Sequence, residues 1–162
     1  MRRLLFVVLL IFCLCFSACG QKKADFSDIL TGPLEAELAG EACGIAFEGK
    51  LVVATCGEAG IAPATLTFYA PRELAGTQLT RDETGAVTLS YDGVSLGDAH
   101  GVGIVLLSLF PGAEQVKHVA LNEAGNTVVL FEGAEIEFSE SGVPLRVKTA
   151  DVTAQILSWN KP

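Results

Sequence analysis

Apolar and polar side chains alternate along most of the chain, and this alternation strongly limits the folds that the chain can adopt. Successive side chains of a strand point to opposite faces of a sheet, so a repeat of two residues predicts a strand with one buried face and one solvated face. Segments with this repeat are 45–53, 65–69, 87–91, 135–138, 145–148 and 152–156. From Ile45 onward the chain is therefore expected to be mainly β.

Short segments that contain glycine separate these strands. They are Glu83-Thr84-Gly85, Asp92-Gly93, Glu123-Ala124-Gly125-Asn126, Glu132-Gly133 and Ser139-Glu140-Ser141-Gly142. Connections this short join antiparallel neighbours, because a parallel return needs a crossover of about a dozen or more residues. The expected fold is mainly β (α+β), with a curved, antiparallel, up-and-down sheet in one domain over residues 26–162.

A leader precedes this domain. Met1-Arg2-Arg3 is positively charged, and an uninterrupted apolar run over 4–16 follows it. This is the pattern of a secretory signal. The run is shorter than the roughly 20 residues that a helix needs to cross a bilayer. Segment 1–18 is therefore expected to be a cleaved signal peptide rather than a permanent membrane span.

The end of the leader, Phe16-Ser17-Ala18-Cys19-Gly20, resembles the lipobox of bacterial lipoproteins. The resemblance implies that the Cys19 thiol receives a diacylglycerol and becomes the first residue after cleavage, with 19–25 as a short tether. Two or three acyl chains hold a protein stably at a membrane. We therefore expect an envelope lipoprotein on the extracytoplasmic side of a bacterial membrane; the alternative is a soluble exported protein with an ordinary cleaved signal.

The residues between the tether and the first alternating segment repeat with a different spacing. Phe26, Leu30, Leu34 and Leu38 recur every four residues, which is close to the helical period. Gly32-Pro33 interrupts this pattern. The spacing therefore predicts two short helical stretches, over 26–31 and 33–41.

One later segment, 101–110, is almost wholly apolar and is followed by Pro111-Gly112. A segment of this kind is either a buried strand or a short helix laid against the apolar face of the sheet, and its leucine content favours the helix. The functional interpretation is a plug or lid over an apolar cavity. The alternative is a helix that only completes the core.

Cys43 and Cys56 are the two thiols expected to remain after processing, and an even pair in an exported protein suggests a disulfide. One continuous strand over 45–55 would hold them about 40 Å apart, whereas a disulfide needs Cα atoms within about 7 Å. A hairpin turning at Gly49-Lys50 would place them opposite each other but would break the alternation of apolar and polar residues. We favour the continuous strand, and the disulfide remains the alternative.

No motif points to catalysis or to a bound metal. His100 and His118 stand alone, and no pair of histidines, cysteines or carboxylates has the spacing of metal ligands. Glu135 and Glu137 place two carboxylates about 7 Å apart on one strand face, which mimics a glycosidase pair but is also how sheets solvate a face. We expect no enzyme and no cofactor, and the formal net charge of −8 excludes a basic nucleic-acid binder.

The order of these parts resembles the lipoprotein-carrier superfamily, namely the LolA/LolB-like proteins and the related mycobacterial lipoproteins. The points of contact are Pro71, Leu74 and Gly76, which precede a strand, and Gly142 with Pro144 before the closing strands. The resemblance covers the arrangement of elements over about residues 26 to 160. It implies an open antiparallel half-barrel, partly filled by helices, whose apolar concave side holds acyl chains.

On that resemblance, one set of apolar side chains lines or covers the cavity: Val102, Ile104, Val105, Leu107, Leu109 and Phe110. The chain carries no evident arginine near this segment of the kind with which a carrier would hold an acyl donor. Two functions stay open. One is an anchored protein that binds a lipid or another hydrophobic ligand, and the other is a structural or interaction lipoprotein with a self-filled core whose acidic face meets an envelope partner.

Overall fold

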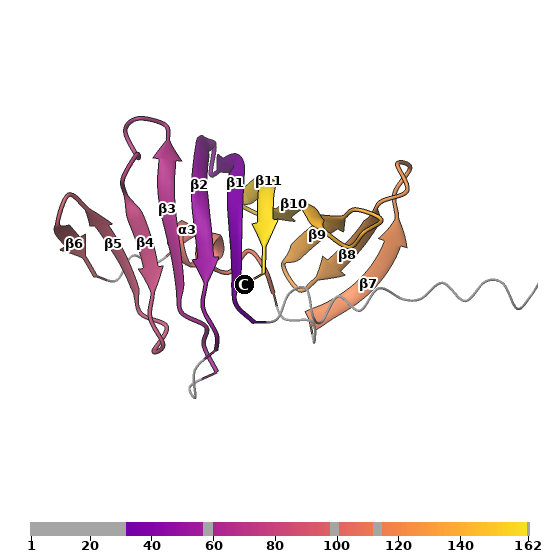
Figure 1. Cartoon of the computed structure of the whole chain (residues 1–162), viewed down its shortest axis with the longest axis horizontal. Helices are drawn as coiled ribbons and strands as arrows, with labels where there is room; N and C mark the ends of the chain where they lie inside the picture. Colours follow the sequence, from indigo (N-terminus) through magenta and orange to yellow (C-terminus); the bar gives the residue numbers. More distant parts are fainter. Residues whose placement is uncertain (1–31, 57–59, 98–100, 112–114, 162) are drawn as a thin grey trace, which may run out of the picture.

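The computed structural model of the chain describes residues 32–56, 60–97, 101–111 and 115–161. The expected signal peptide, the anchor residue Cys19 and the expected helical stretch 26–31 lie outside these residues. Within them, all strands belong to one 11-stranded antiparallel sheet, in the order β6-β5-β4-β3-β2-β1-β11-β10-β9-β8-β7 (Figure 1).

The strands are β1 (Leu34–Ala42), β2 (Ile45–Val53), β3 (Ala64–Ala70), β4 (Gln78–Arg81), β5 (Val87–Tyr91), β6 (Val94–Leu96), β7 (Val116–Leu121), β8 (Thr127–Phe131), β9 (Ala134–Phe138), β10 (Pro144–Thr149) and β11 (Val152–Asn160). One described helix, α3 (Val102–Leu107), lies between β6 and β7 in the sequence. Among the described residues, no helix has both the length and the apolar character needed to cross a bilayer.

The sheet consists of two meanders that meet at the pairing of the first and last strands. β1 to β6 are neighbours in sequence order, β7 to β11 are likewise, and β1 pairs antiparallel with β11. The two ends of the sheet, β6 and β7, are edge strands, so the sheet is open rather than closed. The strands of the second meander are inclined to those of the first (Figure 1), as the twist of a sheet demands. The predicted open, up-and-down antiparallel architecture is confirmed.

The connection between the two edges runs over one face of the sheet, which we name the inner face. It carries α3, which packs on β3 and β4. Leu106, Leu107 and, just beyond the helix, Leu109 are buried in the same core cluster as the inward-facing residues of the strands. Gly103 allows this close packing, because a Cβ there would lie 3.3 Å from the Leu79 side chain. The helical interpretation of the apolar segment is confirmed.

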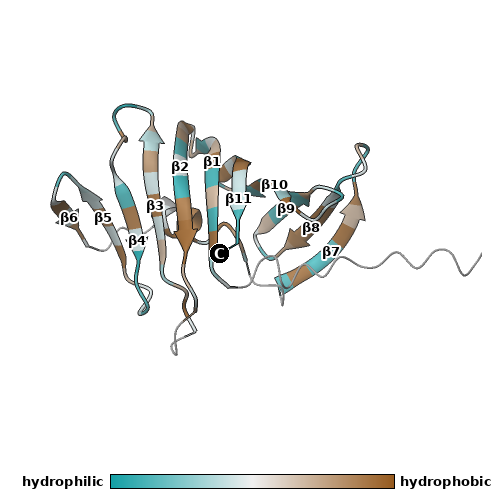
Figure 2. Ribbon diagram, viewed as in Figure 1, coloured by the Kyte–Doolittle hydropathy of each residue, from teal (hydrophilic) through white to brown (hydrophobic). Residues whose placement is uncertain are grey.

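The alternation of side chains persists across the sheet, as the bands of hydropathy along the strands show (Figure 2). The largest fully buried apolar side chains are Leu34, Leu38, Leu51, Leu66, Leu107, Leu109, Val87, Val129, Ile136, Phe138 and Val147. They come from both meanders and from the connection, so one core joins the two halves.

The prediction of a helix over 33–41 is wrong, because this segment is the central strand β1. Leu34, Ala36 and Leu38 are buried, while Glu35 points to the outer face and pairs with Lys50 of β2 at 2.7 Å. A spacing of four residues is also twice the strand period, so Leu34 and Leu38 fit either structure. Pairing with both β2 and β11 decides in favour of the strand.

β2 is one continuous strand, as the alternation favoured, and no hairpin turns at Gly49-Lys50. Cys43 lies in the tight turn between β1 and β2, and Cys56 follows the other end of β2. Both cysteines carry free, exposed thiols. The structure therefore contains no bridge between them, since the length of β2 separates them.

Candidate functional site

A cavity of about 600 Å³ lies over the inner face, beside α3. Its walls come from residues 60–62, the end of β4, α3 and the segment after it, and the hairpins β8–β9 and β10–β11. Both halves of the sheet therefore contribute to it. Its volume is within the range of about 300 to 1,000 Å³ that is typical of small-molecule sites. Its apolar lining includes Ile61, Ala62, Ile104, Val105, Phe110 and Pro111.

Of the six side chains that the sequence analysis proposed for the cavity, the structure places three in the cavity lining and two in the core. Ile104, Val105 and Phe110 line it. Leu107 and Leu109 instead point into the core, where their exposed fractions are 1% and 0%. For Val102 the structure describes the backbone only. One face of the apolar segment thus fills the core while the other faces the cavity.

Phe110 is held in place by Trp159 near the end of β11. The two rings pack edge to face, with centroids 5.1 Å apart and planes at 69°. This geometry is one of the favoured arrangements of aromatic pairs. The contact ties the wall of the cavity to the strand that joins the two meanders.

Arg81, at the end of β4, is one of the polar residues that line the cavity. Its Nε and Nη2 donate to the carbonyl oxygen of Ala62 at 3.1 and 2.9 Å. Its Nη1 donates to Ser108 Oγ, just beyond α3, at 2.6 Å. No arginine is evident near this segment in the sequence, yet the structure places Arg81 beside it. Arg81 and Ser108 are 27 positions apart in the sequence, and only the packing of α3 on β4 brings them together.

The guanidinium of Arg81 has neutral hydrogen-bond partners only. Within the described ranges, no carboxylate oxygen lies within 4 Å of it. Burial lowers the pKa of Arg81 below its ordinary value, yet a guanidinium keeps its proton in proteins. The carboxylates that line the cavity belong to Glu132 and Asp151, which are exposed, and Glu132 pairs with Lys117 at 3.5 Å. The cavity thus carries a half-buried positive charge without a direct counter-ion among the described residues.

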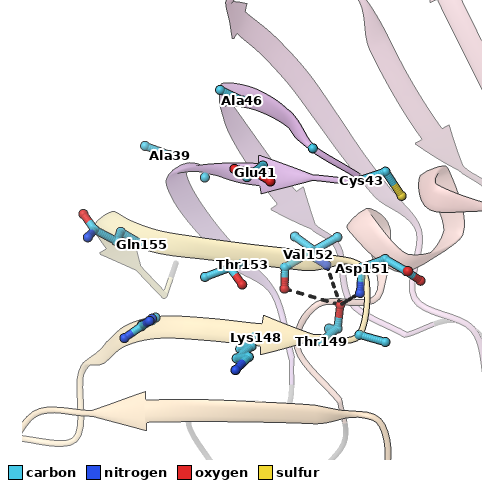
Figure 3. A pocket seen from close by; sticks show the side chains of 14 residues that line it. Ala39, Glu41, Cys43, Ala46, Lys148, Thr149, Asp151, Val152, Thr153 and Gln155 are labelled. Atoms are coloured by element: carbon cyan, nitrogen blue, oxygen red, sulfur yellow. Dashed lines mark hydrogen bonds between the residues drawn. The ribbon is translucent and has the colours of Figure 1, made fainter.

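A second cavity, of about 700 Å³, lies on the outer face over β1, β10 and β11 (Figure 3). Its lining is mainly small or polar, with Ala39 and Ala46 on one side and Lys148 on the other. Thr149 Oγ1 accepts hydrogen bonds from the amides of Val152 and Asp151 and so shapes the β10–β11 turn at its end. Although it is somewhat larger than the inner cavity, it lacks an apolar wall.

The other candidate residues that the structure describes, Glu135, Glu137 and His118, do not line the inner cavity. Glu135 and Glu137 lie on the outer face, and Glu137 Oε1 accepts from the side-chain amides of Asn122 and Asn126 at 2.8 Å each. Glu137 therefore holds the β7–β8 turn. His118 is exposed on β7, and His100 lies outside the described residues. In the part of the chain that the structure covers, no group of three or more His, Cys, Asp and Glu could hold a metal ion.

No protein-family model matches the chain, and no curated protein matches its sequence. Several solved structures resemble it. An uncharacterized conserved protein from Thermus thermophilus has a TM-score of 0.48 and 12% identity, with 85% of this chain and 84% of that chain covered. A LolA superfamily protein from Nitrosomonas europaea has a TM-score of 0.45 and 10% identity, with 84% and 91% covered.

MucB has a TM-score of 0.47 and 12% identity, with 88% of this chain and 59% of MucB covered. This chain thus spans less than two thirds of MucB. These likenesses concern the fold alone. They include a member of the superfamily that the order of elements in the sequence resembles.

Proposed function

We propose that the protein is a lipid-anchored envelope protein that binds a lipid or another hydrophobic ligand in the inner cavity, without catalysis. The observation that carries this proposal is the cavity wall formed by Ile104, Val105 and Phe110. These side chains line a space of about 600 Å³, and Val105 and Phe110 also pack against the edge of the core. Transfer from water is worth about 0.8 kcal/mol per methylene, so an acyl chain of about 14 carbons would contribute on the order of 10 kcal/mol.

Identification of the lipids that co-purify with the protein tests this proposal. The full chain, purified from its cells in mild detergent, should carry a defined lipid that mass spectrometry identifies. Ile104→Glu places a charge in the cavity wall and should abolish this co-purification. Leu157→Glu, at a side chain that is 60% exposed outside the cavity, is the matched control and should retain the lipid. A wild-type protein without lipid and without saturable fatty-acid binding would refute ligand binding.

The anchor has a separate test, which rests on the resemblance of 16–20 to a lipobox. Cys19→Ala should release the protein from membranes or leave it as an uncleaved precursor. A variant with a cut signal that still partitions into the detergent phase would refute the anchor without affecting the cavity.

The second candidate is a structural or interaction lipoprotein. It is favoured by the burial of Leu107 and Leu109, whose side chains belong to the core cluster instead of lining the cavity. The outer face is acidic, with exposed Glu37 and Glu41 on β1. This function predicts an empty cavity and a partner whose binding is lost on charge reversal by Glu37→Lys, while Ile104→Glu leaves it intact.

A further inference from the structure

We infer that the ligand of the inner cavity is an amphiphile with an anionic head group, a carboxylate or a phosphate, and that Arg81 and Ser108 bind this head group. The inference rests on the proposed function, because it names the chemical class of ligand for the same cavity. It differs from that proposal in assigning the specificity to two polar residues.

The guanidinium of Arg81 has hydrogen-bond donors that are not engaged. A guanidinium has five N–H donors, of which the Nε–H and one hydrogen on each of Nη1 and Nη2 are engaged. Two donors remain, and the acceptors that the described residues supply to Arg81 are all neutral. A half-buried cation without a counter-ion is unfavourable, and an anion that reaches it gains charge-assisted hydrogen bonds. The fork of the guanidinium suits the oxygens of a carboxylate or a phosphate.

Ser108 supplies a further hydrogen-bond donor beside this guanidinium. Its Oγ accepts a hydrogen bond from Arg81, so its own O–H stays available as a donor. Ser108 lines the same cavity as Ile104 and Phe110. The polar donors and the apolar wall are therefore adjacent, which suits a molecule with a charged head and a hydrocarbon tail.

The charges that surround the cavity oppose the binding of an anion. The chain has a formal net charge of −8, and the cavity also includes Glu132 and Asp151. Both carboxylates are exposed to water, where screening weakens their effect. Long-range attraction cannot draw an anion to this protein, so any preference for one must come from the short-range contacts with Arg81 and Ser108.

The test compares ligands with one tail and different head groups. Full-length protein in isolated membranes is exposed to a photoreactive palmitic acid, to a photoreactive lysophosphatidic acid and to the corresponding neutral long-chain alcohol. Cross-links are then mapped by mass spectrometry to residues 101–111. The anionic probes should label this segment roughly ten- to hundred-fold more efficiently than the alcohol, the range expected of a charge-assisted hydrogen bond. The two anionic probes distinguish a carboxylate ligand from a phosphate ligand.

Three variants test which residues produce the preference for the anionic probes over the alcohol. Arg81→Gln keeps a donor for Ala62 but removes the charge, and it should equalise acid and alcohol labelling. Ser108→Ala should reduce the preference more modestly. Arg146→Gln makes the same charge change on the outer face and should leave the preference intact.

The outcomes distinguish failure of the anionic head group from failure of hydrophobic binding in the cavity. Equal labelling by acid and alcohol in the wild-type protein would overturn the anionic head group while the hydrophobic cavity stands. No labelling by any probe would overturn both. Loss of acid and alcohol labelling together in Arg81→Gln would show that Arg81 only maintains the cavity, which also overturns the inference.

Discussion

The ring of Phe110 packs edge to face on the ring of Trp159, with the centroids 5.1 Å apart. Phe110 belongs to the connection that crosses the inner face, and Trp159 lies near the end of β11. Two positions earlier, Ser108 accepts a hydrogen bond from Arg81 of β4. The connection is therefore attached to both halves of the sheet within three residues, and these attachments define the cavity between them.

Removal of the Phe110 ring should destabilise the protein and expose its only tryptophan. Since Phe110 is half-buried, Phe110→Ala should cost about 1 to 3 kcal/mol, less than the 3–5 typical of a fully buried aromatic residue. The tryptophan emission should shift to longer wavelength. Thermal unfolding and fluorescence measure both effects. Tyr91→Ala, at a ring that is 56% exposed, is the control, and an equal response from the two variants would contradict the packing.

The two faces of the apolar segment should respond differently to truncation. Leu109 is fully buried, so Leu109→Ala should lower the free energy of unfolding by about 2 to 5 kcal/mol. Ile104 is 39% exposed and lines the cavity, so Ile104→Ala should cost about 1 kcal/mol or less while weakening ligand binding. Chemical denaturation and fatty-acid titration separate the effects. A reversed order of the two stabilities would mean that the helix is rotated from its position here.

The sequence predicts the strands well where the alternation has a single interpretation. Leu66 and Phe68 on β3, and Ile136 and Phe138 on β9, are buried as the pattern requires. The prediction from the sequence fails at β1, where the spacing of Leu34 and Leu38 suits a helix as well as a strand. The strand is selected by pairing with β2 and β11, and β11 lies more than a hundred residues further along the chain. Local pattern carries no information about that pairing.

The candidate site is only partly visible in the sequence for a related reason. Ile104, Val105 and Phe110 are found from the apolar composition of their segment. Arg81 is missed because it belongs to an alternating strand far away in sequence and contacts Ser108 only after the connection folds back over β4. A polar residue on the inward side of a strand is the signal that could have revealed it, since Arg81 follows buried Leu79 by two positions.

Gly40 in β1 should not tolerate a larger side chain. A Cβ at Gly40 would lie 2.2 Å from the backbone oxygen of Thr153 and 2.6 Å from the Cα of Ala154. Because these are backbone atoms of the paired strand β11, the clash cannot be relieved by a side-chain movement. Gly40→Ala should therefore separate β1 from β11 and lower the melting temperature strongly. Gly97→Ala, which meets no atom within 4 Å, should leave it unchanged. Similar melting temperatures for the two variants would contradict the close approach.

Asp82 should contribute stability that acid removes. Its Oδ1 accepts hydrogen bonds from the Thr84 hydroxyl at 2.7 Å, from the Thr84 amide at 2.8 Å and from the Ala86 amide at 3.0 Å. These bonds, with that of the Thr84 side chain foremost, hold the pKa of Asp82 below its ordinary value near 3.8. A carboxylate whose pKa is lower in the folded state stabilises that state fully above the unfolded pKa, and the contribution is lost as the pH falls through the folded pKa.

Asp82→Ala should accordingly unfold more easily than the wild type at pH 7, and the difference between them should shrink steadily once the pH falls below about 3.8. Urea unfolding at a series of pH values measures this difference. Glu83→Ala removes the exposed neighbouring carboxylate in the same turn and should change stability little across the series. If the gap between Asp82→Ala and the wild type were constant from neutral to acid pH, the carboxylate would not be the group that holds the β4–β5 turn.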